Sequence, residues 1–110
     1  MTFQKFSALN HARCRDGFKH NLNDWSASDW MTATMGELGE AANIVKKLNR
    51  VRDGINGNKE SEDALRIKLA TEIADTFIYL DLMAQALGID LESLKASREK
   101  VTYTQVEEFA

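Results

Sequence analysis

The chain has 110 residues, 44% hydrophobic and 28% charged, which is typical of one ordinary globular domain and not of a disordered or fibrous chain. A formal net charge of -3 without a strongly basic block gives no electrostatic support for binding a nucleic-acid polymer. No stretch approaches the roughly 20 apolar residues of a membrane helix, and the amino terminus lacks a signal-peptide core, so we expect a cytoplasmic protein without membrane contact.

The absence of proline and the scarcity of alternating apolar and polar residues favour an all-α chain organised as a single domain, residues 1–110. Cys14 is the only cysteine, so it cannot form an internal disulfide, and a reducing compartment suits it. Nothing near it in the sequence indicates an activated nucleophile, and we interpret it as a buried or half-buried thiol.

Apolar residues at helical spacing predict a first helix from Phe3 to Arg15. The following segment, from His11 to His20, is rich in cationic side chains. We interpret it as a solvated helix end, where the helix macrodipole favours cations. Contact with a phosphate or a base is the alternative.

A second helix is expected to begin at Ser26 or Ser28 and to end at Val51. Ser26 is followed three positions later by an aspartate, a pattern typical of a capping box. Gly36 and Gly39 each lower helix stability by ~1 kcal/mol relative to alanine. We therefore expect another backbone to approach this helix closely at the two glycines.

The polar stretch from Asp53 to Glu60 predicts a loop, and Ser61 is expected to cap a third helix that runs to Leu87. From Leu69 onward this helix is apolar on nearly every side, which is typical of a helix buried in an interior. Asp90 is then expected to cap a fourth helix.

Two pairs of acidic residues stand inside otherwise uncharged stretches of the second and third helices. Glu37 and Glu40 are the only charged side chains in a run of 16 residues, and Glu72 and Asp75 are the only ones in a run of 12. Carboxylates are rarely buried unless they are paired or bound to a metal, because removing an ion from water costs several kcal/mol. We therefore expect a cation close to each pair of acids.

The two pairs are placed to meet if the second and third helices form an antiparallel hairpin. The acids of the second helix lie 11 and 14 residues before Val51, and those of the third lie 11 and 14 residues after Ser61. Both pairs are then about 16–21 Å from the turn. Residues three apart on a helix face one way, so we expect four carboxylates to converge between the helices.

Four converging carboxylates repel one another, and some take up protons unless a cation binds among them. Oxygen ligands without histidine or cysteine select a hard ion, Mg2+ or Mn2+, and such magnesium sites usually hold substrate phosphates as well. The alternative is that the acids are solvated and form weak surface ion pairs with lysines.

Three motifs in chain order resemble one enzyme family: Glu-Leu-Gly-Glu-Ala-Ala (37–42), Glu-Ile-Ala-Asp-Thr-Phe-Ile-Tyr-Leu (72–80) and Leu-Gly-Ile-Asp-Leu (87–91). They resemble the MazG-type, all-α nucleoside triphosphate pyrophosphohydrolases, over roughly Trp30 to Lys100. The resemblance implies Mg2+-dependent cleavage of a (deoxy)nucleoside triphosphate to the monophosphate and pyrophosphate. The expected fold is a four-helix-bundle-type domain with an antiparallel helical hairpin at its centre, completed by oligomerisation.

The resemblance assigns roles to individual residues of this chain. The metal-binding acids would be Glu37, Glu40, Glu72 and Asp75, with Glu37 or Glu40 orienting or deprotonating the attacking water. Tyr79 matches a position often used near the substrate, and Arg98 on the expected fourth helix is a candidate phosphate contact.

Two further residues have open alternatives. Lys47, in register with Glu40, would reach the phosphates, or else would compensate the dipole at its helix end. Trp30, together with Trp25, would stack on the base, or else would pack in the core, since tryptophan buries a large apolar area.

The chain departs from the family pattern in the long connection between the acidic motifs, where Asp53 to Asp63 is interpreted as an insertion, and in its fourth helix. A third helix of about 26 residues spans ~39 Å, too much apolar surface for three other helices to cover, so we expect a homodimer or a dimer of dimers. The rival interpretation is a non-catalytic helical interaction or regulatory protein on the same scaffold.

Overall fold

In a computed structural model of the chain, residues 1–92 are described. The elements, in order, are α1 (Phe3–Ala12), a π-helical turn (Arg13–Gly17), a 3-10 turn (Leu22–Asp24), α2 (Ala27–Arg52) and α3 (Glu62–Ala86). Residues 1–92 contain no strand, which confirms the all-α prediction. They group into two compact units, Trp25–Leu80 and Met1–Asp24 with the described residues from Asp81 onward.

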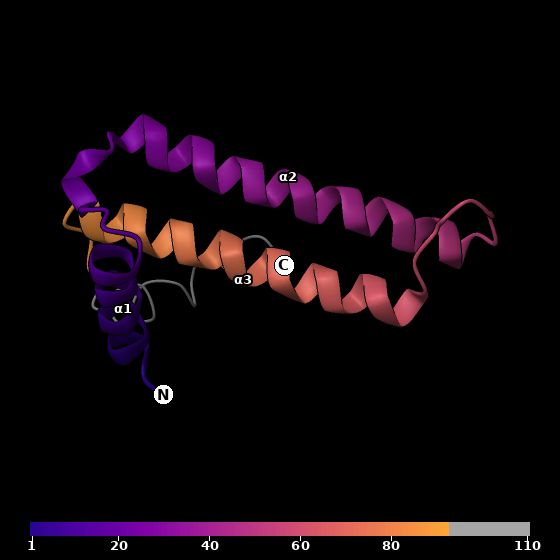
Figure 1. The fold of residues 1–110 in the computed structure, drawn as a ribbon, viewed down its shortest axis with the longest axis horizontal. Helices are drawn as coiled ribbons and strands as arrows, with labels where there is room; N and C mark the ends of the chain where they lie inside the picture. Colours follow the sequence, from indigo (N-terminus) through magenta and orange to yellow (C-terminus); the bar gives the residue numbers. More distant parts are fainter. Residues whose placement is uncertain (93–110) are drawn as a thin grey trace, which may run out of the picture. The chain divides into compact units, whose positions relative to one another are not determined.

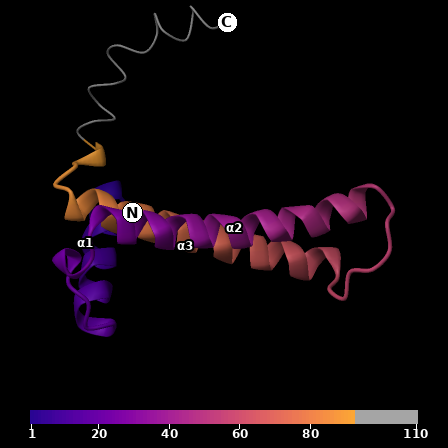
Figure 2. The ribbon, with the colours of Figure 1, turned by 90° about the horizontal axis from the view of Figure 1, so that it is seen from above.

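In the unit Trp25–Leu80, α2 and the part of α3 up to Leu80 lie side by side as an antiparallel hairpin (Figures 1 and 2). The hairpin prediction is confirmed. The four-helix bundle and its completion by oligomerisation stay predictions.

Local hydrogen bonds explain where α2 begins and ends. Ser26 and Asp29 form the predicted capping box: the Ser26 hydroxyl accepts from the Asp29 amide at 3.2 Å, and the Asp29 carboxylate accepts from the Ser26 amide at 2.9 Å. The helix ends at Arg52, one residue beyond the predicted Val51, and Gly54 follows with φ of 69°. This left-handed conformation suits glycine and stops the helix.

The ends of α3 are set in the same way. The Ser61 hydroxyl accepts from the Ala64 amide at 3.1 Å, as expected of its cap. The helix stops at Ala86, and Gly88 takes the left-handed conformation with φ of 70°. The predicted bounds, Ser61 and Leu87, are thus right to within a residue.

The interior of the hairpin is small and mainly apolar. Trp30 and Leu65 are each 1% exposed, and Thr34 is also buried, its hydroxyl donating to the Trp30 carbonyl at 2.8 Å. The Trp30 ring meets Trp25 edge-on at a centroid distance of 4.7 Å. Packing in the core, one of the two alternatives for Trp30, is therefore what the structure shows.

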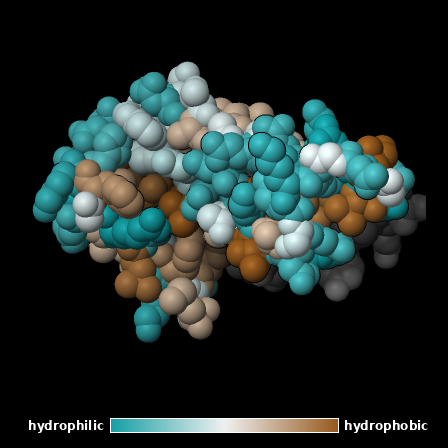
Figure 3. Space-filling model, turned by 45° about the vertical axis from the view of Figure 1, so that its right-hand side comes forward, coloured by the Kyte–Doolittle hydropathy of each residue, from teal (hydrophilic) through white to brown (hydrophobic). Residues whose placement is uncertain are grey.

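Between Ile67 and Leu80, α3 exposes several large apolar side chains. Ile67, Ile73, Phe77 and Leu80 are 70%, 56%, 48% and 42% exposed. On the face drawn in Figure 3, apolar side chains reach the surface between hydrophilic ones. The prediction that α3 is buried on nearly every side is therefore wrong for one copy of the chain as far as the structure describes it, because α2 covers only one side of α3 there.

In the other unit, α1 is shorter than predicted. It ends at Ala12 instead of Arg15 because the chain widens into the π-helical turn, in which the Phe18 amide donates to the Arg13 carbonyl five residues earlier at 3.2 Å. Cys14 is buried there, and its thiol donates to the His20 carbonyl at 3.2 Å. The burial of Cys14 confirms the interpretation as a buried thiol, and that burial raises the pKa of the thiol.

Asp81 links α1 to the end of α3. The residue is 2% exposed, and its carboxylate accepts from the Ser7 hydroxyl at 2.6 Å, the Asn10 side-chain amide at 2.9 Å and the Gln85 side-chain amide at 2.9 Å. Three donors make the burial of this ion tolerable. The sequence pattern did not single out this network.

Asp90 behaves as expected of a cap, since its carboxylate accepts from the Glu92 amide at 3.1 Å. The remainder of the predicted fourth helix, including Arg98, lies outside the described residues. Within residues 1–92, no helix combines the length and apolar character that crossing a bilayer requires.

Candidate metal centre

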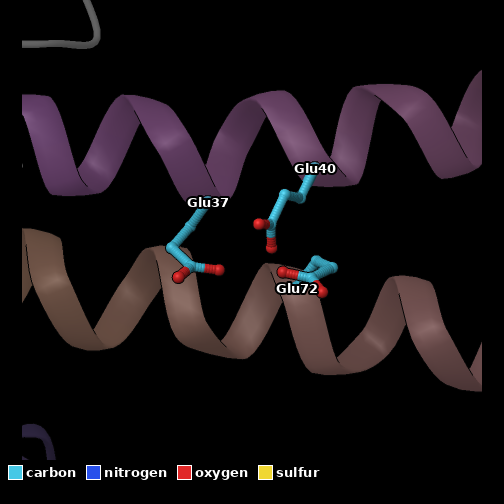
Figure 4. A group of neighbouring side chains, drawn as sticks. All are labelled: Glu37, Glu40 and Glu72. Atoms are coloured by element: carbon cyan, nitrogen blue, oxygen red, sulfur yellow. The ribbon is translucent and has the colours of Figure 1, made fainter.

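Three of the four predicted metal ligands come together in the middle of the hairpin. One carboxylate oxygen from each of Glu37, Glu40 and Glu72 can be chosen so that all three atoms lie within 4.8 Å of one another. Figure 4 shows Glu37 and Glu40 extending from α2 toward α3, where Glu72 lies along the edge of α3 that faces them. The convergence follows from the equal spacing of the acids from the two ends of the loop.

Asp75 lies beside this cluster but is not one of the three closest acids. Its negative charge still contributes to raising the pKa of both Glu40 and Glu72, so it is part of the same electrostatic environment. Residues three apart point about 60° apart around a helix axis. That angle allows one member of a pair to face α2 more directly than the other.

Mutual interactions within the cluster raise the pKa values of two of its members, Glu40 and Glu72. The pKa of Glu40 is raised, chiefly by a hydrogen bond with the Glu72 carboxyl group and next by the charge of Glu72. The pKa of Glu72 is raised as well, chiefly by a hydrogen bond with Glu37. Two carboxyl groups can share a hydrogen bond only while one of them holds a proton, since an ionised carboxylate only accepts.

The Oε2 atom of Glu72 tests whether a cation fits. It is shielded from solvent and has no hydrogen-bond partner among the described residues. In that part of the chain, no lysine, arginine or histidine forms an ion pair with Glu37, Glu40, Glu72 or Asp75. A shielded carboxylate oxygen without a donor is costly, and a hard dication bound by oxygen atoms removes that cost. The donor set therefore fits Mg2+ or Mn2+.

Lys47 is engaged by the hairpin loop. Its ammonium group lies 3.2 Å from a carboxylate oxygen of Glu60, and its backbone carbonyl accepts from the Asn58 side chain at 2.8 Å. Lys68 of α3 reaches the same Glu60 oxygen at 3.4 Å. Lys68 was not among the predicted site residues, although its position four residues before Glu72 on the same helix face was a usable signal.

The aromatic residues assigned to the substrate lie at the other end of the same unit. Trp30 is buried, so a base would reach it only if the ring were uncovered. Tyr79 is half-buried, and its ring stacks against Trp25 at a centroid distance of 6.4 Å and an interplanar angle of 20°. Trp25 is half-buried as well. These two partly exposed rings are better placed than Trp30 to meet a base.

The two glycines near the acids do not receive a neighbouring backbone. A Cβ atom built at Gly36 or Gly39 would meet nothing within 4 Å outside its own helix. The expectation of close approach is therefore wrong for the single chain, and nothing in the hairpin explains the loss of helix stability at these positions.

Comparison of the chain with known protein families, curated proteins and solved structures finds no match. The likeness to the MazG-type enzymes stays a prediction that rests on its motifs.

Proposed function

We propose that the protein is a Mg2+-dependent pyrophosphohydrolase that cleaves a (deoxy)nucleoside triphosphate to the monophosphate and pyrophosphate. The observation that carries the proposal is the shielded, donor-free Oε2 atom of Glu72 among three converging carboxylates. The acidic motifs and their likeness to the MazG-type enzymes supply the reaction, and the single cysteine and composition favour the cytoplasm as its compartment.

Glu37, Glu40 and Glu72 would hold the ion, with Asp75 next to them, and Mn2+ is the alternative to Mg2+. When bound, the ion offsets negative charge on the phosphates and polarises the phosphoryl oxygens.

Glu40 is suited to handle the attacking water because it is the most open of the three clustered acids. Its carboxylate would accept a proton from water as the water oxygen bonds to the α-phosphorus. The bond from that phosphorus to the bridging oxygen breaks, and pyrophosphate leaves with the electron pair. Glu37 would share in orienting the water.

The test is hydrolysis of a panel of dNTPs with Mg2+, with pyrophosphate as the measured product. Glu40→Gln and Asp75→Asn should lower turnover at least about 100-fold, while circular dichroism shows unchanged helicity. Glu62→Gln is the matched control, because Glu62 is an exposed acid in the first turn of α3, outside the cluster, that forms a surface ion pair with Arg66. Full hydrolysis by Glu40→Gln, or none by the unaltered protein, would contradict the proposal.

The second candidate is an interaction protein without catalysis, and exposed apolar side chains favour it. Seven such residues, each at least 41% exposed, follow helical spacing on α2 and α3: Met31, Met35, Leu38, Val45, Ile73, Phe77 and Leu80. We propose that they are covered in a homodimer or a dimer of dimers. The dNTP assay separates the two candidates, since a purely interacting protein forms the oligomer but releases no pyrophosphate.

A further inference from the structure

Two lysines from different helices converge on a single oxygen atom. The ammonium groups of Lys47 on α2 and Lys68 on α3 lie 3.2 Å and 3.4 Å from Oε1 of Glu60, in the loop between the helices. Two positive charges therefore face one negative charge, which leaves an excess of one positive charge at this point of the hairpin.

The loop is built to hold this arrangement. The side chain of Asn58 donates to the backbone carbonyl of Lys47 at 2.8 Å, and the Lys47 ammonium group donates to Glu60. The loop is therefore bonded to both the backbone and the side chain of Lys47. Hydrogen bonding to its own backbone amide, and then to Lys47, lowers the pKa of Glu60 to about 2. Glu60 is consequently ionised at neutral pH and keeps both lysines in place.

The lysines share the helix faces that carry the acids. Lys47 lies seven residues after Glu40, and Lys68 lies four residues before Glu72, so each is in register with an acid of the cluster. Both are displaced toward the loop, by about 10 Å and about 6 Å along the helix axes. The space between the helices is therefore acidic at its middle and cationic on the loop side.

We propose that Lys47 and Lys68 form the subsite for the two phosphates that leave as pyrophosphate, and that Glu60 is the positioning residue of this subsite. This inference rests on the proposed function for the identity of the substrate. With the α-phosphate at the acids, the β- and γ-phosphates point toward the loop and the nucleoside toward Tyr79. Ammonium groups are suitable point charges for phosphate.

Glu60 has two effects on the lysines. Its ion pairs are partly exposed and hence weak, so the ammonium groups can turn to a more highly charged polyphosphate. Before the substrate binds, Glu60 keeps Lys68 from forming an ion pair with Glu72, which lies one helical turn away. Such a pair would compete with the metal for the Glu72 carboxylate. Loss of Glu60 should therefore weaken binding of both pyrophosphate and Mg2+.

The first experiment measures binding and does not depend on hydrolysis of the substrate. Binding of pyrophosphate in the presence of Mg2+ is measured by calorimetry for the full chain and for Lys47→Met and Lys68→Met. Each variant should bind roughly tenfold more weakly or worse, because a charge-assisted contact to phosphate is lost. Lys59→Met, in the same loop but outside the pair, should bind within about twofold of the unaltered protein.

The second experiment separates positioning from general stability. Glu60→Gln should raise KM for the triphosphate and the Mg2+ concentration needed for half-maximal rate, with kcat changed much less. Glu60→Asp keeps the charge, so its KM and Mg2+ requirement should lie closer to those of the unaltered protein.

If a lysine variant loses helicity, the NMR signals of the lysine ammonium groups in the unaltered protein decide instead. Pyrophosphate should shift those of Lys47 and Lys68 and not that of Lys59.

The outcomes distinguish the two proposals. Unchanged pyrophosphate binding and KM in both lysine variants, with Glu40→Gln inactive, would overturn the subsite and leave the proposed function standing. Lysine-dependent pyrophosphate binding without hydrolysis of any dNTP would support the subsite and refute the proposed function.

Discussion

Glu72, in the candidate metal centre, is a residue whose charge lowers the stability of the folded chain at neutral pH. Its pKa and that of Glu40 lie above the ordinary value of 4.5, so just above that value the folded chain holds more protons than the unfolded chain. Stability from this source is present at lower pH and is lost as pH rises through the raised pKa values. At neutral pH the metal-free cluster therefore lowers the free energy of unfolding, and a bound cation reverses that effect.

Replacing Glu72 by glutamine tests this balance. Glu72→Gln should raise the Tm of the protein in chelator at pH 7, because one of the repelling charges is removed, and should reduce the rise in Tm that Mg2+ produces. Differential scanning calorimetry with and without Mg2+ measures both. Glu62→Gln should change neither, since its side chain is exposed and outside the cluster. A Tm of the unaltered protein that does not respond to Mg2+ would contradict the prediction.

At the scale of helices and loops, the predictions that succeeded depend on local chemistry. Ser26 and Ser61 identify helix starts because a side-chain oxygen satisfies a free amide nearby in sequence. The meeting of Glu37, Glu40 and Glu72 was predictable because two helices and one loop fix their relative height. Contacts that depend on the path of a loop or on tertiary packing, and not on the spacing of residues along a helix, were not predicted.

The missed features have identifiable causes. The π-helical turn after α1 replaces one hydrogen-bonding pattern by another at a small difference in energy, so apolar spacing does not reveal it. The pairing of Glu60 with Lys47 and Lys68 depends on the path of the loop. Turn-forming residues predict that a loop is present but do not predict the path that its backbone takes. Arg98 lies outside the described residues and stays a prediction.

The anchoring of the loop has its own pH signature. The pKa of Glu60 falls from 4.5 to about 2 on folding, so its stabilising effect is fully present above pH 4.5 and is lost as pH falls toward about 2. The Tm difference between the unaltered protein and Glu60→Gln should thus be constant from pH 7 to about 5 and vanish near pH 2. Thermal melts followed by circular dichroism across this range measure it, and a difference that persists undiminished near pH 2 would refute the anchoring role.

At the scale of the whole molecule, the apolar side chains that α2 and α3 expose within the described residues suggest association with a second copy. Met31, Met35 and Leu38 on α2 recur at intervals of four and three residues, as do Ile73, Phe77 and Leu80 on α3. Neither stripe includes the acids of the candidate site. A second copy can therefore cover both stripes without displacing the acids of the candidate site.

Light scattering tests this assembly. The unaltered protein should have two or four times the mass of one chain, and its Tm should rise with concentration, because association stabilises the folded state by mass action. Phe77→Glu should shift the mass to that of one chain, since a buried charge in an interface of about 800 Å2 per partner is not tolerated. Ile55→Glu is the matched control, an equally drastic change at an exposed loop residue outside both stripes. A single-chain mass for the unaltered protein at all concentrations would show instead that these side chains stay in water.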